Sequence, residues 1–145
     1  MPGFSAEYLQ EAQERDDLVN QVRSFVSRGT PPSREEKDSC LPGSLALLRD
    51  WKRLFLRNGV LLRRRRRPND GTEHLQVIAP QSIQEKAITR FHDEAGHFGF
   101  RRTYRLVGDR FFWHGMEESV KQWCAKCKRC AVSKPPVWKE WTLPT

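Results

Sequence analysis

Four side chains in the second half of the chain have the types and the spacing of a metal site. His92 and His97 are separated by four residues, and Cys127 and Cys130 form a Cys-x2-Cys pair further along the chain. Two imidazoles and two thiolates complete the tetrahedral shell in which structural zinc is commonly bound. The sequence therefore predicts one Zn²⁺ ion with a structural role.

The choice between two cysteine pairs stays open, because Cys124 and Cys127 have the same spacing as Cys127 and Cys130. Cys124 follows Trp123 within a helix-like apolar pattern, where a cysteine commonly packs as a small hydrophobic residue. Cys127 lies where that pattern ends, and Cys130 follows by about one helical turn. The pattern favours Cys127 and Cys130 as the ligands, with Cys124 in place of Cys130 as the alternative.

Five short motifs follow one another around these residues: HDEAGHFG at 92–99, RRTYRLV at 101–107, RFFWHGM at 110–116, VKQW at 120–123 and CKRCAVSK at 127–134. In type and order they resemble the H2C2 zinc-binding N-terminal domain of retroviral and gypsy-type (Ty3-like) retrotransposon integrases. The resemblance implies zinc ligation by His92, His97, Cys127 and Cys130, in agreement with the helical pattern. It also implies a three-helix bundle with a helix-turn-helix arrangement.

The elements that must position these ligands give a predicted fold that is mainly α. We expect a zinc-stabilised three-helix bundle, preceded by a β-hairpin extension and by N-terminal helices. The expected divisions are a helical N-terminal region at 1–57, the hairpin extension at 58–80, the zinc domain at 81–134 and a tail at 135–145. Ser82 and Glu85 form a capping-box pattern for the helix that leads to His92.

Aromatic residues between the two halves of the predicted site are expected to pack in the core. Phe111, Phe112 and Trp113 are the large apolar groups available to surround a small metal centre, and stacking on nucleobases is the alternative role. His114 is expected on a surface turn rather than on the metal.

Amphipathic patterns predict helices in the N-terminal region. Ser5 can cap one helix whose apolar stripe continues to Val26 and which Gly29 ends. Ser33 and Glu36 form a capping-box pattern for a short second helix. The simplest role for these helices is packing.

A further helix is expected from Leu45 to Phe55, ended by the Asn58-Gly59 pair. This region resembles, more weakly, the stretch between the RNase H and integrase regions of gypsy-type polyproteins. The residues that carry this resemblance are Gln13, Asp16, Trp51, Leu54 and Gly59. It implies that the N-terminal region is a former inter-domain linker.

The sequence from Val60 to Pro80 has the alternation of a β-hairpin, with a turn at 68–71. The hairpin resembles the N-terminal extension of spumaviral, gammaretroviral and gypsy-type integrases. Its first strand carries five adjacent arginines, Arg63 to Arg67, which repel one another unless a polyanion or nearby acids neutralise them. Alternate residues of a strand point to opposite faces, so phosphate contact by some of them and a solvated hairpin edge are both open.

The charge of the chain is concentrated in its second part. Residues 1–50 carry six basic and nine acidic side chains, whereas residues 51–145 carry twenty and nine, so the net charges are −3 and +11. A strongly basic region favours binding to nucleic acid, with incidental basicity as the alternative. The candidate phosphate contacts are Arg63, Arg64, Arg65, Arg101, Arg102, Arg105, Lys126, Lys128 and Arg129.

The predicted function is that of a non-catalytic module. A closed His2Cys2 shell leaves zinc no open position for substrate, and the chain shows no resemblance to the integrase catalytic core, so we expect no enzyme activity. The resemblance implies DNA binding, multimerisation or both, in a truncated or domesticated gypsy-type element. The alternatives are a protein-interaction adaptor without DNA binding and a fragment of an active integrase polyprotein.

The remaining expectations concern partners and compartment. DNA and a second copy of the chain are the expected partners, with no small-molecule substrate and no membrane, because no apolar run approaches the length of a membrane span. Three cysteines within seven positions fit metal binding better than disulfides, which indicates a reducing compartment, nuclear or cytoplasmic.

Overall fold

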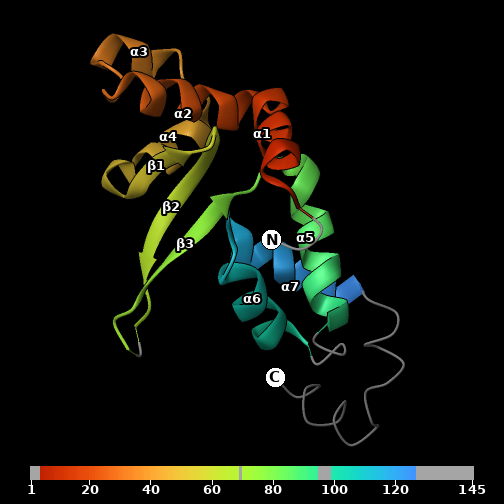
Figure 1. The fold of residues 1–145 in the computed structure, drawn as a ribbon. Coiled ribbons are helices and arrows are strands. Elements are labelled where there is room, and N and C mark those ends of the chain that lie inside the picture. The colour runs from red at the N-terminus through yellow and green to blue at the C-terminus, as the bar shows by residue number, and fades with distance from the viewer. Residues whose placement is uncertain (1–3, 69, 95–98, 127–145) are drawn as a thin grey trace, which may run out of the picture.

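The computed structural model describes residues 4–68, 70–94 and 99–126. In chain order its elements are α1 (Ala6–Arg15), α2 (Asp17–Arg28), α3 (Arg34–Asp38), α4 (Pro42–Leu48), the 3-10 turn η1 (Trp51–Arg53), β1 (Leu54–Arg57), β2 (Val60–Arg66), β3 (Glu73–Ile78), α5 (Gln81–Glu94), α6 (Phe100–Gly108), β4 (Phe111–Phe112) and α7 (Met116–Lys126). Helices α2 and α4 pack on one face of the sheet, and α1, α5, α6 and α7 pack on the other (Figure 1). The prediction of a mainly helical fold is confirmed.

The N-terminal helix expected to run without a break is two helices, α1 and α2. Ser5 caps α1 as predicted, accepting a hydrogen bond from the Tyr8 amide at 3.1 Å. The chain leaves the helical conformation at Asp16, whose carboxylate accepts from the Val19 amide at 3.1 Å and so starts α2. The expectation of one helix was wrong because the apolar stripe continues across a capping residue. The Ser33–Glu36 capping box is confirmed in α3.

The helix expected from Leu45 to Phe55 is also wrong beyond its first half. Helix α4 ends at Leu48, and β1 begins at Leu54 after the 3-10 turn. Asn58 and Gly59 both have positive φ, 53° and 78°, which is the conformation of a tight hairpin turn. The turn therefore folds β1 back onto β2, with Arg57 opposite Val60, instead of ending a helix.

The predicted hairpin of β2 and β3 is confirmed, but it forms the centre of a larger sheet. The strands pair antiparallel from Leu62 opposite Val77 to Arg66 opposite Glu73, and the sheet order is β1-β2-β3-β4. Strand β4 pairs parallel to β3, and the Val77 amide donates to the Arg110 carbonyl at 2.8 Å. This pairing was not predicted, because two residues are too few to show an alternating pattern.

Each face of the sheet has its own hydrophobic core. One face contributes Val60, Leu62 and Val77 to a cluster with α1, α5, α6 and α7, and this cluster contains the buried residues Phe4, Leu9, Val60, Leu62, Val77, Ala79, Ile83, Ala87, Ile88, Phe91, Val107, Phe111, Trp113, Met116, Val120 and Cys124. The other face contributes Leu54, Leu61 and Ile78 to a smaller cluster with Val19, Val22 and Leu47 of α2 and α4. The segments expected as separate regions thus share their cores.

The side chain of Gln13 joins α1 to the sheet where β2 and β3 separate. Their ladder ends at Leu62 opposite Val77, and the carboxamide of Gln13 occupies the next position. Its nitrogen donates to the Leu61 carbonyl at 3.1 Å and to the Ile78 carbonyl at 2.8 Å, and its oxygen accepts from the Leu61 amide at 2.7 Å. Gln13 is fully buried. Its carboxamide supplies the hydrogen bonds that Leu61 and Ile78 would otherwise make to a neighbouring strand.

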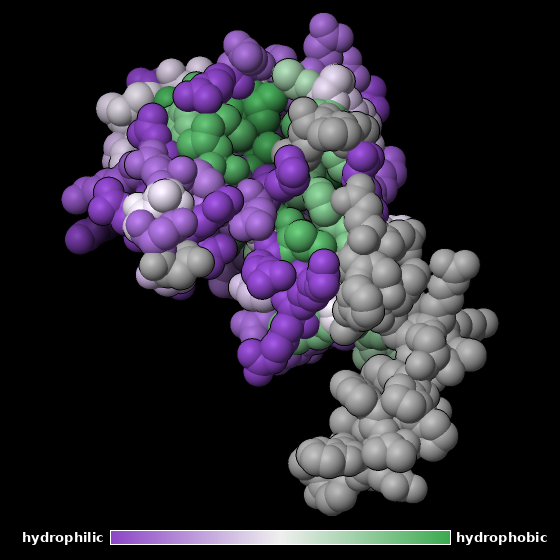
Figure 2. Space-filling model, turned by 60° about the horizontal axis from the view of Figure 1, so that its bottom comes forward, coloured by the Kyte–Doolittle hydropathy of each residue, from purple (hydrophilic) through white to green (hydrophobic). Residues whose placement is uncertain are grey.

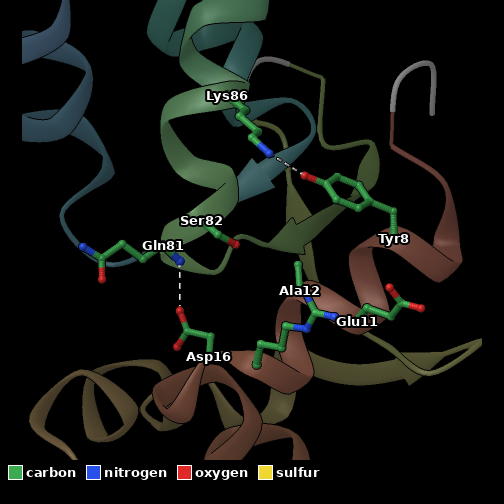
Figure 3. Close-up of a pocket in the computed structure, with 8 residues that line it drawn as sticks. Tyr8, Glu11, Ala12, Asp16, Gln81, Ser82 and Lys86 are labelled. Atoms are coloured by element: carbon green, nitrogen blue, oxygen red, sulfur yellow. Dashed lines mark hydrogen bonds between the residues drawn. The ribbon is translucent and has the colours of Figure 1, made fainter.

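Asp16 makes a second connection, from the α1–α2 junction to α5. Its other carboxylate oxygen accepts from the Gln81 amide at 2.9 Å, across a cleft of about 490 Å³ that Tyr8 and Lys86 border on the opposite side (Figure 3). Lys86 Nζ donates to the Tyr8 hydroxyl at 2.9 Å. Because α5 begins at Gln81, the expected capping box of Ser82 and Glu85 is wrong: the cap comes from Asp16 instead.

Candidate metal centre and nucleic-acid interface

Helices α5, α6 and α7 carry the described part of the predicted metal site. Helix α5 packs against α6, and α6 packs against α7 (Figure 1). The three predicted helices are therefore present, and their stabilisation by zinc remains a prediction. As a separate finding, no helix of the described residues has the length and apolarity that crossing a bilayer requires.

His92 lies in the last turn of α5 and is 1% exposed. Its Nδ1 is 3.2 Å from the hydroxyl oxygen of Thr103 on α6, which is fully buried. That hydroxyl donates its one proton to the Gly99 carbonyl at 2.9 Å, so it accepts a hydrogen bond from Nδ1–H of the imidazole. The proton on Nδ1 leaves the lone pair of the ring on Nε2, which is the form of histidine that binds a metal.

The other three predicted ligands, His97, Cys127 and Cys130, lie outside the described residues. Within the described ranges, no group of three or more His, Cys, Asp or Glu side chains could hold a metal ion. The structure thus positions His92 and leaves the completed shell a prediction. The donor set itself, two imidazoles and two thiolates, fits zinc.

Cys124 lies on the buried face of α7 together with Met116 and Val120. It is 9% exposed and belongs to the larger hydrophobic cluster. This is the environment expected for a packing cysteine. The choice between Cys130 and Cys124 as a ligand nevertheless stays a prediction.

The segment between α6 and α7 places its aromatic residues in the interior. Phe111 is fully buried and Trp113 is 4% exposed, so the prediction that they form core is confirmed. Trp113 Nε1 donates to the Ser119 hydroxyl at 3.2 Å, which fixes the first turn of α7. His114 is exposed on the intervening turn, as expected.

Exposure alternates along the arginines of β2, as expected for a strand. Arg63 is directed inward: its guanidinium contacts Asp50 at 3.1 Å and Gln76 at 2.7 Å and lies 4.1 Å from the centre of the Phe112 ring. Its side chain is 11% exposed. Arg63 therefore links β2 to Asp50 and to Gln76 on β3, and its contact with phosphate remains a prediction.

The next arginines lie nearer the solvent. Arg64 is half exposed, pairs with Glu73 at 3.5 Å and stacks over Phe55. Arg65 is half-buried, and its guanidinium lies beside Gly108 at the end of α6. The hairpin and α6 meet at this point, where Gln76 donates to the Gly108 carbonyl at 2.6 Å, and both extend downward from it in Figure 1.

Helix α6 presents the clearest basic surface of the described residues. Arg101, Arg102 and Arg105 are exposed, whereas Thr103 and Val107 are buried on the opposite side. No acidic residue lies within Phe100–Gly108. Lys126 is exposed at the end of α7, and Lys128 and Arg129 lie outside the described residues. Figure 2 shows hydrophilic side chains around an apolar area on the lower side of the molecule.

Comparison with known proteins identifies the segment that contains these helices. The family model of the integrase zinc binding domain matches residues 79–136. That segment is similar to the integrase zinc-binding domain. The match begins just before α5 and includes all four predicted ligands, so the resemblance seen in the sequence motifs is confirmed.

Curated proteins that are similar to this chain carry a gypsy-element name. Gypsy retrotransposon integrase-like protein 1 of Homo sapiens and that of Macaca fascicularis are each 31% identical over 70 residues, or 47% of this chain. The protein of that name from Bos taurus is 34% identical over 56 residues, or 37% of the chain. The chain spans 13% of the length of the first two relatives and 11% of the third.

Thr103 contacts the predicted ligand His92, and the sequence motifs alone did not reveal this contact. The motif RRTYRLV contains Thr103 but does not indicate what its side chain contacts. A signal was available, because Thr103 lies one helical turn before the buried Val107 and therefore faces inward. A polar side chain on such a face needs a hydrogen-bond partner, and in this protein the partner is His92.

Proposed function

We propose that the integrase zinc-binding segment of this chain binds one Zn²⁺ through His92, His97, Cys127 and Cys130. The observation that carries this proposal is the buried imidazole of His92, whose Nδ1 hydrogen bond to Thr103 selects Nε2 as the ligating atom. A zinc ion in this closed shell supplies a cross-link between the ends of the helical unit and adds to its stability. Thr103 orients the ring, and Cys124 packs in the core.

Metal content and cobalt spectra test the ligand assignment. Each of His92, His97, Cys124, Cys127 and Cys130 is replaced by alanine, and the Zn²⁺ bound per chain is measured. We expect zinc to be lost in every variant except Cys124→Ala. Cobalt-loaded protein should show the intense visible bands of a tetrahedral ion with thiolate ligands. Zinc retained in Cys130→Ala and lost in Cys124→Ala would transfer the site to the other cysteine pair.

We further propose that the module binds duplex DNA through its phosphates, with little sequence preference. Support comes from the exposed arginines of α6, from the absence of acidic residues within that helix, and from its junction with the arginine-rich hairpin. The contacts proposed within the described residues are Arg64, Arg65, Arg101, Arg102, Arg105 and Lys126, and Lys128 and Arg129 belong to the same set. This role implies no catalysis by the chain.

Salt dependence separates electrostatic DNA binding from other modes. With the eight phosphate contacts proposed, the logarithm of the affinity should fall with the logarithm of salt concentration with a slope of roughly −7. Arg101→Ala combined with Arg105→Ala should reduce that slope by about 2. The matched control, Arg34→Ala with Arg49→Ala, removes the same charge from exposed positions on α3 and at the end of α4. Equal slopes for the two double variants would contradict the proposal.

Two other functions are distinguished by the same preparations. Absence of DNA binding together with a clean dimer in light scattering would favour a multimerisation module. Absence of both would favour an adaptor for another protein. A longer product that continues with spaced metal-binding carboxylates would make the chain part of an active integrase.

A further inference from the structure

A groove runs along the free edge of the sheet, on the side of the molecule formed by the N-terminal helices. Strand β1 is at the edge and pairs with β2 on its inner side. Residues of β1, of η1 and of the C-terminal turn of α2 line a groove of about 590 Å³. The lining residues are Val26, Ser27 and Gly29 from α2 and its cap, Trp51 and Lys52 from η1, and Leu54, Phe55 and Leu56 from β1.

The groove combines apolar walls with the edge of β1, which has β2 as its one strand neighbour among the described residues. Val26, Trp51 and Leu56 are half-buried there. Gly29 forms the end of one wall in a left-handed conformation, φ 85°, and no atom of the described residues lies within 4 Å of the position that a β-carbon would take there. A strand edge beside a helix is the arrangement in which an extended peptide is bound by strand addition.

Charge around the groove defines the chemistry of such a peptide. Lys52, Arg53 and Arg57 are exposed at the two ends of β1. Within the described part of the chain, none of the three takes part in an ion pair. Nearby Asp50 is bound by Arg63, so it does not neutralise them. A strand entering the groove therefore meets three cations, and the described residues that line the groove include no acid.

We propose that this groove binds an extended acidic peptide of another protein, which adds as a strand to β1. Alternate apolar side chains of the peptide would enter the groove against Val26, Trp51 and Leu56. The intervening acidic side chains would face Lys52, Arg53 and Arg57. This surface is separate from the α6 surface proposed for DNA, and its occupant is a protein segment, so the inference adds a protein partner to the proposed function.

A second copy of the chain is a poorer occupant than an acidic peptide. Antiparallel pairing of two β1 strands would bring the cations of one copy toward the same cations of the other. Like charges placed opposite each other on neighbouring strands are destabilising. Charged residues at an edge strand are also a common protection against such self-association.

The probe for this proposal is a fluorescein-labelled peptide of about ten residues in which valine alternates with glutamate. Binding to the full chain is measured by fluorescence anisotropy, and the contact surface is mapped by amide chemical shifts. We expect shifts in Lys52–Arg57 and at the end of α2. Lys52→Glu combined with Arg57→Glu should weaken binding by about tenfold. The control Arg34→Glu with Lys37→Glu makes the same charge change on exposed positions of α3 and should bind as the native chain does.

Two altered peptides test strand addition and charge separately. N-methylation of the peptide backbone removes its amide donors and should abolish binding, because a strand partner needs those donors. Replacement of glutamate by lysine should do the same, because the groove then repels the peptide. Equal binding by either altered peptide would overturn the proposal, as would no binding by the original one. Loss of DNA affinity in the Lys52→Glu, Arg57→Glu variant would assign these cations to DNA instead.

Discussion

Gln13→Leu is the substitution that most directly tests how this fold is held together. Leucine has a similar volume, so it can fill the space between β2 and β3, but it has no hydrogen-bonding group. The amide and carbonyl of Leu61 and the carbonyl of Ile78 would each lose the partner that Gln13 now supplies. All three groups lie where the side chain of Gln13 is fully buried, so water cannot replace it without opening the sheet.

The magnitude follows from the number of groups that lose a partner. An unsatisfied buried polar group costs about 1–3 kcal/mol, so three such groups give roughly 3–9 kcal/mol before relaxation. Partial separation of the strands should reduce this cost, and we expect the free energy of unfolding to fall by about 4 kcal/mol. A domain of this size has a total stability of about 5–15 kcal/mol. Gln13→Leu should therefore lower the midpoint of thermal unfolding by about 10 °C or more.

Urea unfolding of the zinc-loaded protein, followed by tryptophan fluorescence and circular dichroism, measures this loss. The matched control is Gln10→Leu, which makes the same chemical change on the same helix. Gln10 is half-buried and bonds to Glu14 near the solvent, so the control should cost less than about 0.5 kcal/mol. Equal stability of the two variants would refute the reasoning, because the inserted carboxamide would then contribute nothing that leucine cannot supply.

Three further predictions concern other contacts. Thr103→Val should weaken zinc binding about 10–100-fold in competition with a chelator, because His92 loses the acceptor that orients it, whereas Thr103→Ser should bind nearly as tightly. Asp16→Ala removes the caps of both α2 and α5 and should cost about 2 kcal/mol in urea unfolding, twice the cost of an ordinary cap. Arg28 lowers the pKa of Glu36 from its usual 4.5 to about 2, so the stabilisation by this carboxylate is complete above pH 4.5 and is lost as the pH falls toward 2. In Arg28→Met, NMR titration should show the pKa of Glu36 rising toward 4.5, and an unchanged value would contradict the assignment.

The features that sequence could predict are those with a local cause. The capping box of Ser33 and Glu36 needs four consecutive residues, and it forms as expected. The β2–β3 hairpin has a long alternation and a turn rich in turn-forming residues. The inward face of α6 follows from helical spacing alone. The order of the motifs around His92 is also sufficient to indicate the integrase zinc-binding family, and the family match agrees with it.

The errors arose where a local signal had two meanings. Asn58-Gly59 can end a helix or turn a hairpin, and the hairpin is formed because β1 gains a partner in β2 and buries Leu54. The partners of Arg63 could not be predicted either, because the sequence shows five adjacent arginines with nothing to distinguish them. The contacts of Arg63 with Asp50 and Phe112 depend on how distant segments meet, and the periodicity of the sequence carries no information about that. The break of the first helix at Asp16 was missed for the same reason, because one partner of its carboxylate is the distant amide of Gln81.

Gln13 and Asp16 give a physical meaning to the Gln-x-x-Asp pattern of the first helix. One residue closes the gap between β2 and β3, and the other caps the start of α5, the helix that carries His92 at its opposite end. Removal of the N-terminal region would leave the Leu61 and Ile78 carbonyls and the Gln81 amide without these partners, and would uncover the smaller core. In this chain the integrase zinc-binding segment is therefore held by contacts that lie outside the matched residues. A fragment that starts at residue 58 should be markedly less stable than the whole chain, even with zinc bound.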